Sequence, residues 1–167
     1  MRVLVEATGM GFNNSGYPGA FTVPVQNIIN SLVSGKVLNL YSGSSLIGEE
    51  RIDIEHPNAT KQMNVEDFIK KDERLWDWVI LDPPYAITRT DVKLNGYGIK
   101  GSVSANVIMR RLLKDYLQTH ADNVLYLDYC APMIKGFSRE KLWLLLPGGF
   151  HNVRVLSWLK KHTERLI

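Results

Sequence analysis

Residues 76–85 read WDWVILDPPY, a buried-looking apolar run that ends on a carboxylate, two prolines and an aromatic residue. The apolar run from Trp78 to Leu81 is bounded by turn residues, which predicts a short buried strand. It ends on the carboxylate of Asp82, followed by Pro83, Pro84 and Tyr85. Each proline fixes its φ near about −65°, so the residues after the strand are held in one extended shape. Because open α/β sheets bind ligands at the carboxyl ends of their strands, Asp82 to Tyr85 are candidate site residues.

Other apolar segments alternate between the periods of strands and of helices. We expect strands at residues 1–7, 37–41, 51–54, 78–81, 124–129, 142–146 and 153–159. The last two are linked by Pro147-Gly148-Gly149, which is too short for a helical crossover, so this pair should be antiparallel. The sequence predicts a Rossmann-like three-layer α/β sandwich, with a mostly parallel seven-stranded sheet and an antiparallel edge strand.

Three helices are expected between these strands. The first carries an amphipathic pattern from Val25 to Val33, starts near Thr22 and Pro24 and stops at Gly35. The second starts at Asn64, with Asp67 three positions on, as in a capping box. For the third, the expected apolar face consists of Val107, Ile108, Leu112, Tyr116 and Leu117.

Composition narrows the class of protein. A chain of 167 residues predicts one domain, residues 1–167, in which residues 1–21 form an amino-terminal arm or loop. The net charge of +3 and the pI near 9.0 permit contact with nucleic acid, although many proteins without such a partner are equally basic. The single Cys130 excludes an internal disulfide and a multi-cysteine metal site, and we expect it in the core of a cytoplasmic protein.

Neither a membrane nor a metal site is indicated. No apolar run approaches the roughly 20 residues that span a bilayer, and the amino terminus lacks the apolar core of a signal peptide, so we expect a soluble protein. The four histidines are scattered, with no cysteine or aspartate at ligand spacing.

A second strand end has a ligand-binding composition. The strand at 37–41 runs through Tyr41 into Ser42, Gly43 and Ser44, small residues whose backbone can lie close to a ligand. Asp53 ends the next strand and could accept hydrogen bonds from the ribose hydroxyls of an adenosine-type cofactor. An ordinary turn and a solvated strand end are the alternatives.

The Asp82 stretch suits an exocyclic amine. If a carboxylate oxygen of Asp82 and the carbonyl oxygen of Pro83 accept its two hydrogens, the nitrogen lone pair becomes available. Tyr85 offers a flat face on which an extruded base can stack. The alternative is a strand that ends in a rigid turn, with Asp82 capping local amides and Tyr85 covering the core.

Together, residues 37–45, Asp53 and Asp82-Pro83-Pro84-Tyr85 resemble the amino-methyltransferases that use S-adenosylmethionine, especially the DNA adenine-N6 and cytosine-N4 group. The resemblance implies that Asp82 and Pro83 bind the target amine. Further cofactor contacts are implied at Tyr17, Pro18, Gly19 and Phe21, which resemble the family's remote cofactor-side motif, and at Asn64, which stands where the family often has an acid.

Besides the asparagine at position 64, the sequence departs from this family in two further ways. Only nine residues, Ser42 to Glu50, separate two strands that should be parallel, so the usual helix between them should be missing or reduced to a turn. No stretch is left for a target-recognition domain, and this role would fall to the arm, to a partner subunit or to the polar loop 86–101. Its candidate substrate contacts are Arg89, Lys93, Tyr97 and Lys100.

The resemblance therefore implies methyl transfer from S-adenosylmethionine to a nucleobase amine, with adenine N6 in DNA as the first candidate. Cytosine N4 in DNA and guanine N2 in RNA are alternatives within the same class. A non-catalytic nucleic-acid-binding subunit that retains the fold is the alternative from another class.

Overall fold

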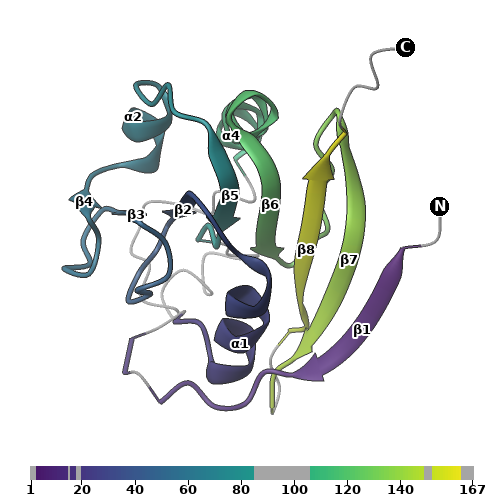
Figure 1. Ribbon diagram of the computed structural model, residues 1–167. Coiled ribbons are helices and arrows are strands. Elements are labelled where there is room, and N and C mark those ends of the chain that lie inside the picture. Colours follow the sequence, from purple (N-terminus) through teal and green to yellow (C-terminus); the bar gives the residue numbers. More distant parts are fainter. Residues whose placement is uncertain (1–2, 15, 18–19, 85–105, 149–151, 163–167) are drawn as a thin grey trace.

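A computed structural model describes residues 3–14, 16–17, 20–84, 106–148 and 152–162 of the chain (Figure 1). These ranges contain eight strands and three helices: β1 (Leu4–Gly9), α1 (Val23–Leu32), β2 (Val37–Leu40), β3 (Glu50–Asp53), β4 (Lys61–Gln62), α2 (Val65–Ile69), β5 (Trp76–Leu81), α4 (Val107–His120), β6 (Ala121–Asp128), β7 (Phe137–Leu146) and β8 (Arg154–Lys161). Within them, no helix has the length and apolar composition needed to cross a bilayer.

All the strands join one sheet in the order β1-β7-β8-β6-β5-β2-β3-β4. The predicted α/β fold with a mostly parallel sheet is confirmed, and every predicted strand is present. One further strand was not predicted. It is the two-residue β4, which pairs with the end of β3.

The antiparallel strand is not at the edge of the sheet, where it was predicted. β8 forms the expected antiparallel hairpin with β7, but it also pairs antiparallel with β6 and so lies inside the sheet. Leu156 and Leu159 of β8 are fully buried, because core residues cover both faces of the sheet at this strand. The edge position falls instead to β1, which pairs parallel with β7.

The two faces of the sheet carry different helices (Figure 1). α1 packs over alternate residues of the central strands, such as Ile80 and Leu125. α2 and α4 pack on the opposite face, over Val79 and Val124. This alternation follows from the period of two along each strand, and it confirms the three-layer arrangement.

The connection from β2 to β3 contains no helix, as its length predicted. We call Tyr41 to Glu49 the return segment, because it runs back along β2 before β3 begins in parallel with it. Asn39, fully buried in β2, donates from Nδ2 to Ser45 Oγ (3.2 Å) and to the Ile47 carbonyl (3.1 Å). A buried side-chain amide thus fixes the segment that replaces a crossover helix.

Two predictions about burial were wrong. Val107 and Ile108 are exposed, because α4 buries the face that carries Met109 and Leu113 together with the expected Tyr116 and Leu117. Cys130 is also exposed, since it follows β6 and lies beyond the edge of the sheet rather than within a strand.

The return segment provides a stability test at Gly48. Its φ is +101°, and an added Cβ would lie 3.1 Å from the Val37 carbonyl oxygen, which is backbone and cannot move aside. We expect Gly48→Ala to lower the free energy of unfolding by about 1–3 kcal/mol, measured by urea denaturation.

Gly136→Ala is the matched control, because Gly136 also has a positive φ of +83° but an added Cβ would meet no atom within 4 Å. Its loss should be the smaller of the two. Equal losses in the two variants would contradict close packing of the return segment on β2.

Candidate active site at the carboxyl edge of the sheet

The chain reverses its direction of travel across the sheet between β2 and β5. β3 and β4 follow on one side of β2, whereas β6 follows on the other side of β5. Leu40 pairs with Leu81, so the first residues beyond these strands, Tyr41 and Asp82, lie side by side at the carboxyl edge. Such a switch point is where open α/β sheets bind their ligands.

Asp82 is held at this point by a buried strand. Residues 78–81 of β5 are all buried, Asp82 itself is partly buried, and Pro83 after it is buried. Burial raises the pKa of Asp82 to about 7, while the positive charge of Arg154 lowers it and the negative charge of Asp128 adds to the rise. A carboxyl group that titrates near neutrality in a ligand-binding position is typical of functional sites.

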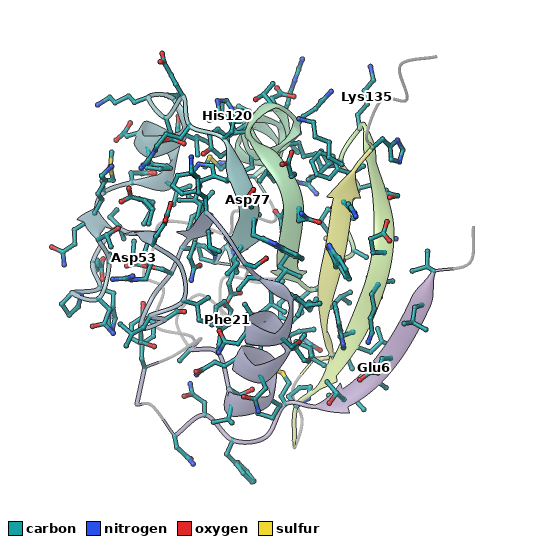
Figure 2. The ribbon with its side chains drawn as sticks, viewed as in Figure 1. Glu6, Phe21, Asp53, Asp77, His120 and Lys135 are labelled. Atoms are coloured by element: carbon teal, nitrogen blue, oxygen red, sulfur yellow. The ribbon has the colours of Figure 1, made fainter. Side chains whose placement is uncertain are left out.

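Asp53 connects the return segment after β2 with the loop after β3, beside the switch point. Its Oδ2 accepts a hydrogen bond from the Gly43 amide (2.9 Å), and its Oδ1 accepts from the amides of Glu55 (3.0 Å) and His56 (2.9 Å). A carboxylate oxygen can accept two hydrogen bonds, so Oδ2 can still receive a ligand hydroxyl. Figure 2 shows Asp53 on the β3 side of the sheet, away from His120 and Lys135, which lie just before the amino ends of β6 and β7.

Tyr17 brings the amino-terminal arm to the same place. Its ring meets the His56 ring edge-on, with centroids 4.7 Å apart, and an added Cβ at Gly43 would lie 2.8 Å from Tyr17 Cε1. Burial raises the pKa of the Tyr17 hydroxyl, and the charges of Asp53, Glu55 and Asp82 raise it further. Tyr17 therefore lies within electrostatic reach of both strand ends that the sequence singled out.

Several buried polar atoms at this edge have no hydrogen-bond partner within the described part of the chain. They are Thr22 Oγ1, Ser42 Oγ and the hydroxyl of Tyr41. Tyr41 also has a positive φ of 59°, a strained conformation for a bulky residue, and Thr22 caps α1 without a side-chain hydrogen bond. Buried polar groups are normally satisfied, so Thr22 Oγ1 and Ser42 Oγ fit a polar ligand held against the ends of β2 and α1, whereas Tyr41 packs on the opposite face, with α2 and α4.

The other candidate residues vary in position. Ser44 accepts from the Asn58 side chain through its carbonyl (2.9 Å), and Asn64 caps α2 by accepting from the Glu66 amide (2.9 Å). Phe21 is buried in the core beneath α1 (Figure 2). Contacts of these residues with a cofactor stay predictions. The remaining candidates lie outside the described residues: Pro18, Gly19, Tyr85, Arg89, Lys93, Tyr97 and Lys100.

Two charged residues at this edge were not among the predicted site residues. Asp128 ends β6 with its side chain 1% exposed, and Arg154 begins β8. The pattern that singled out Asp82, an apolar strand ending in aspartate, also occurs at Leu125-Tyr126-Leu127-Asp128 and could have indicated Asp128. Arg154 reaches the site only because β8 inserts next to β6, which no local pattern in the sequence predicts.

Comparison with known proteins supports the fold alone. No protein-family model matches the sequence, and no curated protein matches it. Among solved structures, the "Putative methyltransferase yhhF from Escherichia coli" aligns over 98% of this chain and 99% of its own, with a TM-score of 0.50 and 10% sequence identity. The chain therefore shares the Rossmann-like methyltransferase fold with that protein.

The raised pKa of Asp82 predicts that its negative charge lowers the stability of the fold, to an extent that depends on pH. The folded-state pKa of about 7 lies above the ordinary value of 3.8, so the ionised carboxylate destabilises the fold fully above pH 7 and not at all below about pH 4. Asp82→Asn removes this charge with little change of shape. We expect a higher melting temperature than wild type at pH 8 and an unchanged one at pH 4.

Asp122→Asn is the matched control, because Asp122 is exposed at the opposite end of β6. It should leave the melting temperature unchanged at both pH values. A stabilisation by Asp82→Asn of the same size at pH 4 and pH 8 would contradict the assigned titration.

Proposed function

We propose that this protein transfers a methyl group from S-adenosylmethionine to an exocyclic amino group of a nucleobase. Adenine N6 in DNA is the first candidate substrate. The observation that carries the proposal is the position of Asp82 and Pro83, which follow a buried strand directly at the switch point of the sheet. The shared fold with a protein described as a methyltransferase supports the same class of reaction.

The amine requires two hydrogen-bond acceptors. The lone pair of an aromatic amino group is delocalised into its ring, which makes the nitrogen a poor nucleophile. A carboxylate oxygen of Asp82 and the carbonyl oxygen of Pro83 would accept the two N–H groups and favour the geometry in which the lone pair points outward. Pro84 has no N–H that could compete for a carbonyl, and the two prolines restrict the backbone around this acceptor.

The side of the edge nearer β3 would hold the cofactor, which supplies an electrophilic methyl group when bound. Asp53 Oδ2 would accept from a ribose hydroxyl beside Gly43, where the missing side chain leaves room for the Tyr17 ring. Thr22 Oγ1 and Ser42 Oγ, which are buried without partners among the described residues, would donate to the polar end of the molecule.

Transfer itself would be an in-line displacement that depends on position more than on a strong base. The amine must approach the methyl carbon to about 3 Å, and holding both reactants in this geometry can supply much of the rate acceleration. The methylated nitrogen loses a proton readily, and above pH 7 the ionised Asp82 could accept it. Stacking of the base on Tyr85 and contacts from Arg89, Lys93, Tyr97 and Lys100 belong to this proposal and rest on the sequence alone.

We expect Asp82→Ala to reduce methyl transfer by about 100-fold or more, the scale seen when one preorganised hydrogen-bonding group is removed from an active site. The assay incubates the full chain with tritiated S-adenosylmethionine and either DNA or RNA, and then identifies the methylated nucleoside. Asp82→Asn retains one acceptor oxygen and should lose less activity than Asp82→Ala.

Asp122→Asn serves as the control and should retain wild-type transfer, since Asp122 is exposed at the far end of β6. N6-methyl-2′-deoxyadenosine from DNA supports the proposal in full, whereas N4-methyl-2′-deoxycytidine from DNA or N2-methylguanosine from RNA would keep the reaction and change the substrate. Undiminished turnover in Asp82→Ala would overturn the role of Asp82. Tight nucleic-acid binding without cofactor binding, measured by calorimetry, would favour the non-catalytic subunit instead.

A further inference from the structure

The two edges of the described sheet are built differently. One edge is β4, which has only two residues, one of them the charged Lys61. Short strands and lysines are common means of keeping a sheet edge from pairing with another chain. The other edge is β1, which has six residues and pairs with β7 without a register shift (Figure 1). β1 contains neither lysine nor proline, so this edge lacks the usual protection.

The outer side of β1 presents backbone hydrogen-bonding groups. Met10, the residue after β1, donates from its amide to the Leu146 carbonyl oxygen of β7 (2.9 Å). Backbone groups alternate between the two sides of a strand, so every second residue before Met10 also faces β7. The N–H and C=O groups of Val5, Ala7 and Gly9 therefore point away from β7. No other strand of the described chain lies on that side.

The side chains of β1 are exposed and mostly apolar. Leu4 is 60% exposed and Val5 is 54% exposed. Glu6 carries the only charge of the strand, and its Oε2 lies 2.6 Å from Nζ of Lys141 in β7. Because this charge has a partner within the chain, it does little to repel an approaching strand. A long edge strand with these properties is a template for pairing with another chain.

We propose that β1 pairs antiparallel with β1 of a second copy of this chain, across a two-fold axis that passes beside Ala7. In this register Ala7 lies opposite Ala7 of the partner subunit, and Val5 lies opposite Gly9 of the partner subunit. All three outward-facing residues then exchange both of their backbone hydrogen bonds with the other chain. No other register pairs all three of them. The contact uses the same surface on both copies, as a two-fold dimer requires.

The side chains of β1 are compatible with this register. Glu6 lies opposite Thr8 of the partner subunit, so like charges do not face each other. A shift by two residues would place Glu6 opposite Glu6 of the partner subunit, which is destabilising. Val5 lies over Gly9 of the partner subunit, where an added Cβ would meet no atom within 4 Å. This open position adjoins Leu146, which is 45% exposed and pairs with Gly9 in its own chain.

The dimer keeps the two candidate active sites apart. Antiparallel pairing of β1 reverses the direction of every strand in the second copy. The carboxyl edges of the two copies therefore lie at opposite edges of the joint sheet, and neither site receives residues from the other chain. The inference is thus independent of the methyl transfer proposed above.

The oligomeric state of the full chain tests the inference. Sedimentation equilibrium over about 5–300 μM, a range that includes weak and transient association, should show a dimer whose fraction rises with concentration. Ala7→Lys places two positive charges opposite each other at the axis and should weaken dimerisation by about tenfold or more. Gln62→Lys is the matched control, because it adds the same charge to the exposed β4 at the other edge and should leave the dimer unchanged.

A charge swap tests the register. Ala7→Glu alone should also weaken dimerisation, but an equal mixture of Ala7→Glu and Ala7→Lys should form a heterodimer, since opposite charges then face each other at the axis. Far-UV circular dichroism establishes that each variant is folded, as expected for an exposed position. A mixture that stays monomeric would overturn the proposed register.

Hydrogen exchange measured by NMR locates the contact. The amides of Val5 and Gly9 should exchange slowly in concentrated wild type and rapidly in Ala7→Lys at the same concentration. The amides of Glu6 and Thr8 face β7 and should exchange slowly in both. A wild-type chain that stays monomeric at about 300 μM, or a dimer that Ala7→Lys leaves intact, would overturn the inference without affecting the proposed function.

Discussion

The burial of β5 is the constraint on which the rest of the site depends. This strand lies between β2 and β6 and is covered on both faces, so its run from Trp78 to Leu81 is apolar and buried. Asp82 is the first polar residue beyond that core, and the following prolines hold the chain where it emerges. A carboxylate in this position is partly dehydrated, and for this reason its pKa moves toward neutrality and its neighbours matter.

The carboxyl edge is divided into two halves that meet at the switch point. On the β3 side, Asp53 ties Gly43 of the return segment to the loop after β3, and the partnerless hydroxyls of Thr22 and Ser42 lie at the ends of α1 and β2. On the β6 side, burial raises the pKa of Asp82, the charge of Arg154 lowers it and the charge of Asp128 raises it. Tyr17 is electrostatically coupled to Asp53 and to Asp82, so the arm joins the two halves.

Local patterns in the sequence predicted where the strands and helices lie. They predicted less well which strands are neighbours in the sheet. The apolar run before Asp82, the helix start at Asn64 and the missing helix after Ser42 follow from short stretches of chain, and the structure has each of them. The place of β8 inside the sheet was missed because strand order depends on long-range packing. Val107 and Ile108 were misassigned for a similar reason: their spacing fits an apolar face, but α4 turns Met109 and Leu113 toward the sheet.

A crystal structure of the full chain with S-adenosylhomocysteine, the demethylated form of the proposed cofactor, would show whether Asp82 lies beside a cofactor site. We expect the ligand to lie across the ends of β2 and β3, with its ribose at Asp53 and its sulfur facing Asp82 across a gap that admits one amino group. A ligand bound away from this edge, or one whose sulfur is separated from Asp82 by core side chains, would show that Asp82 does not hold the methyl acceptor.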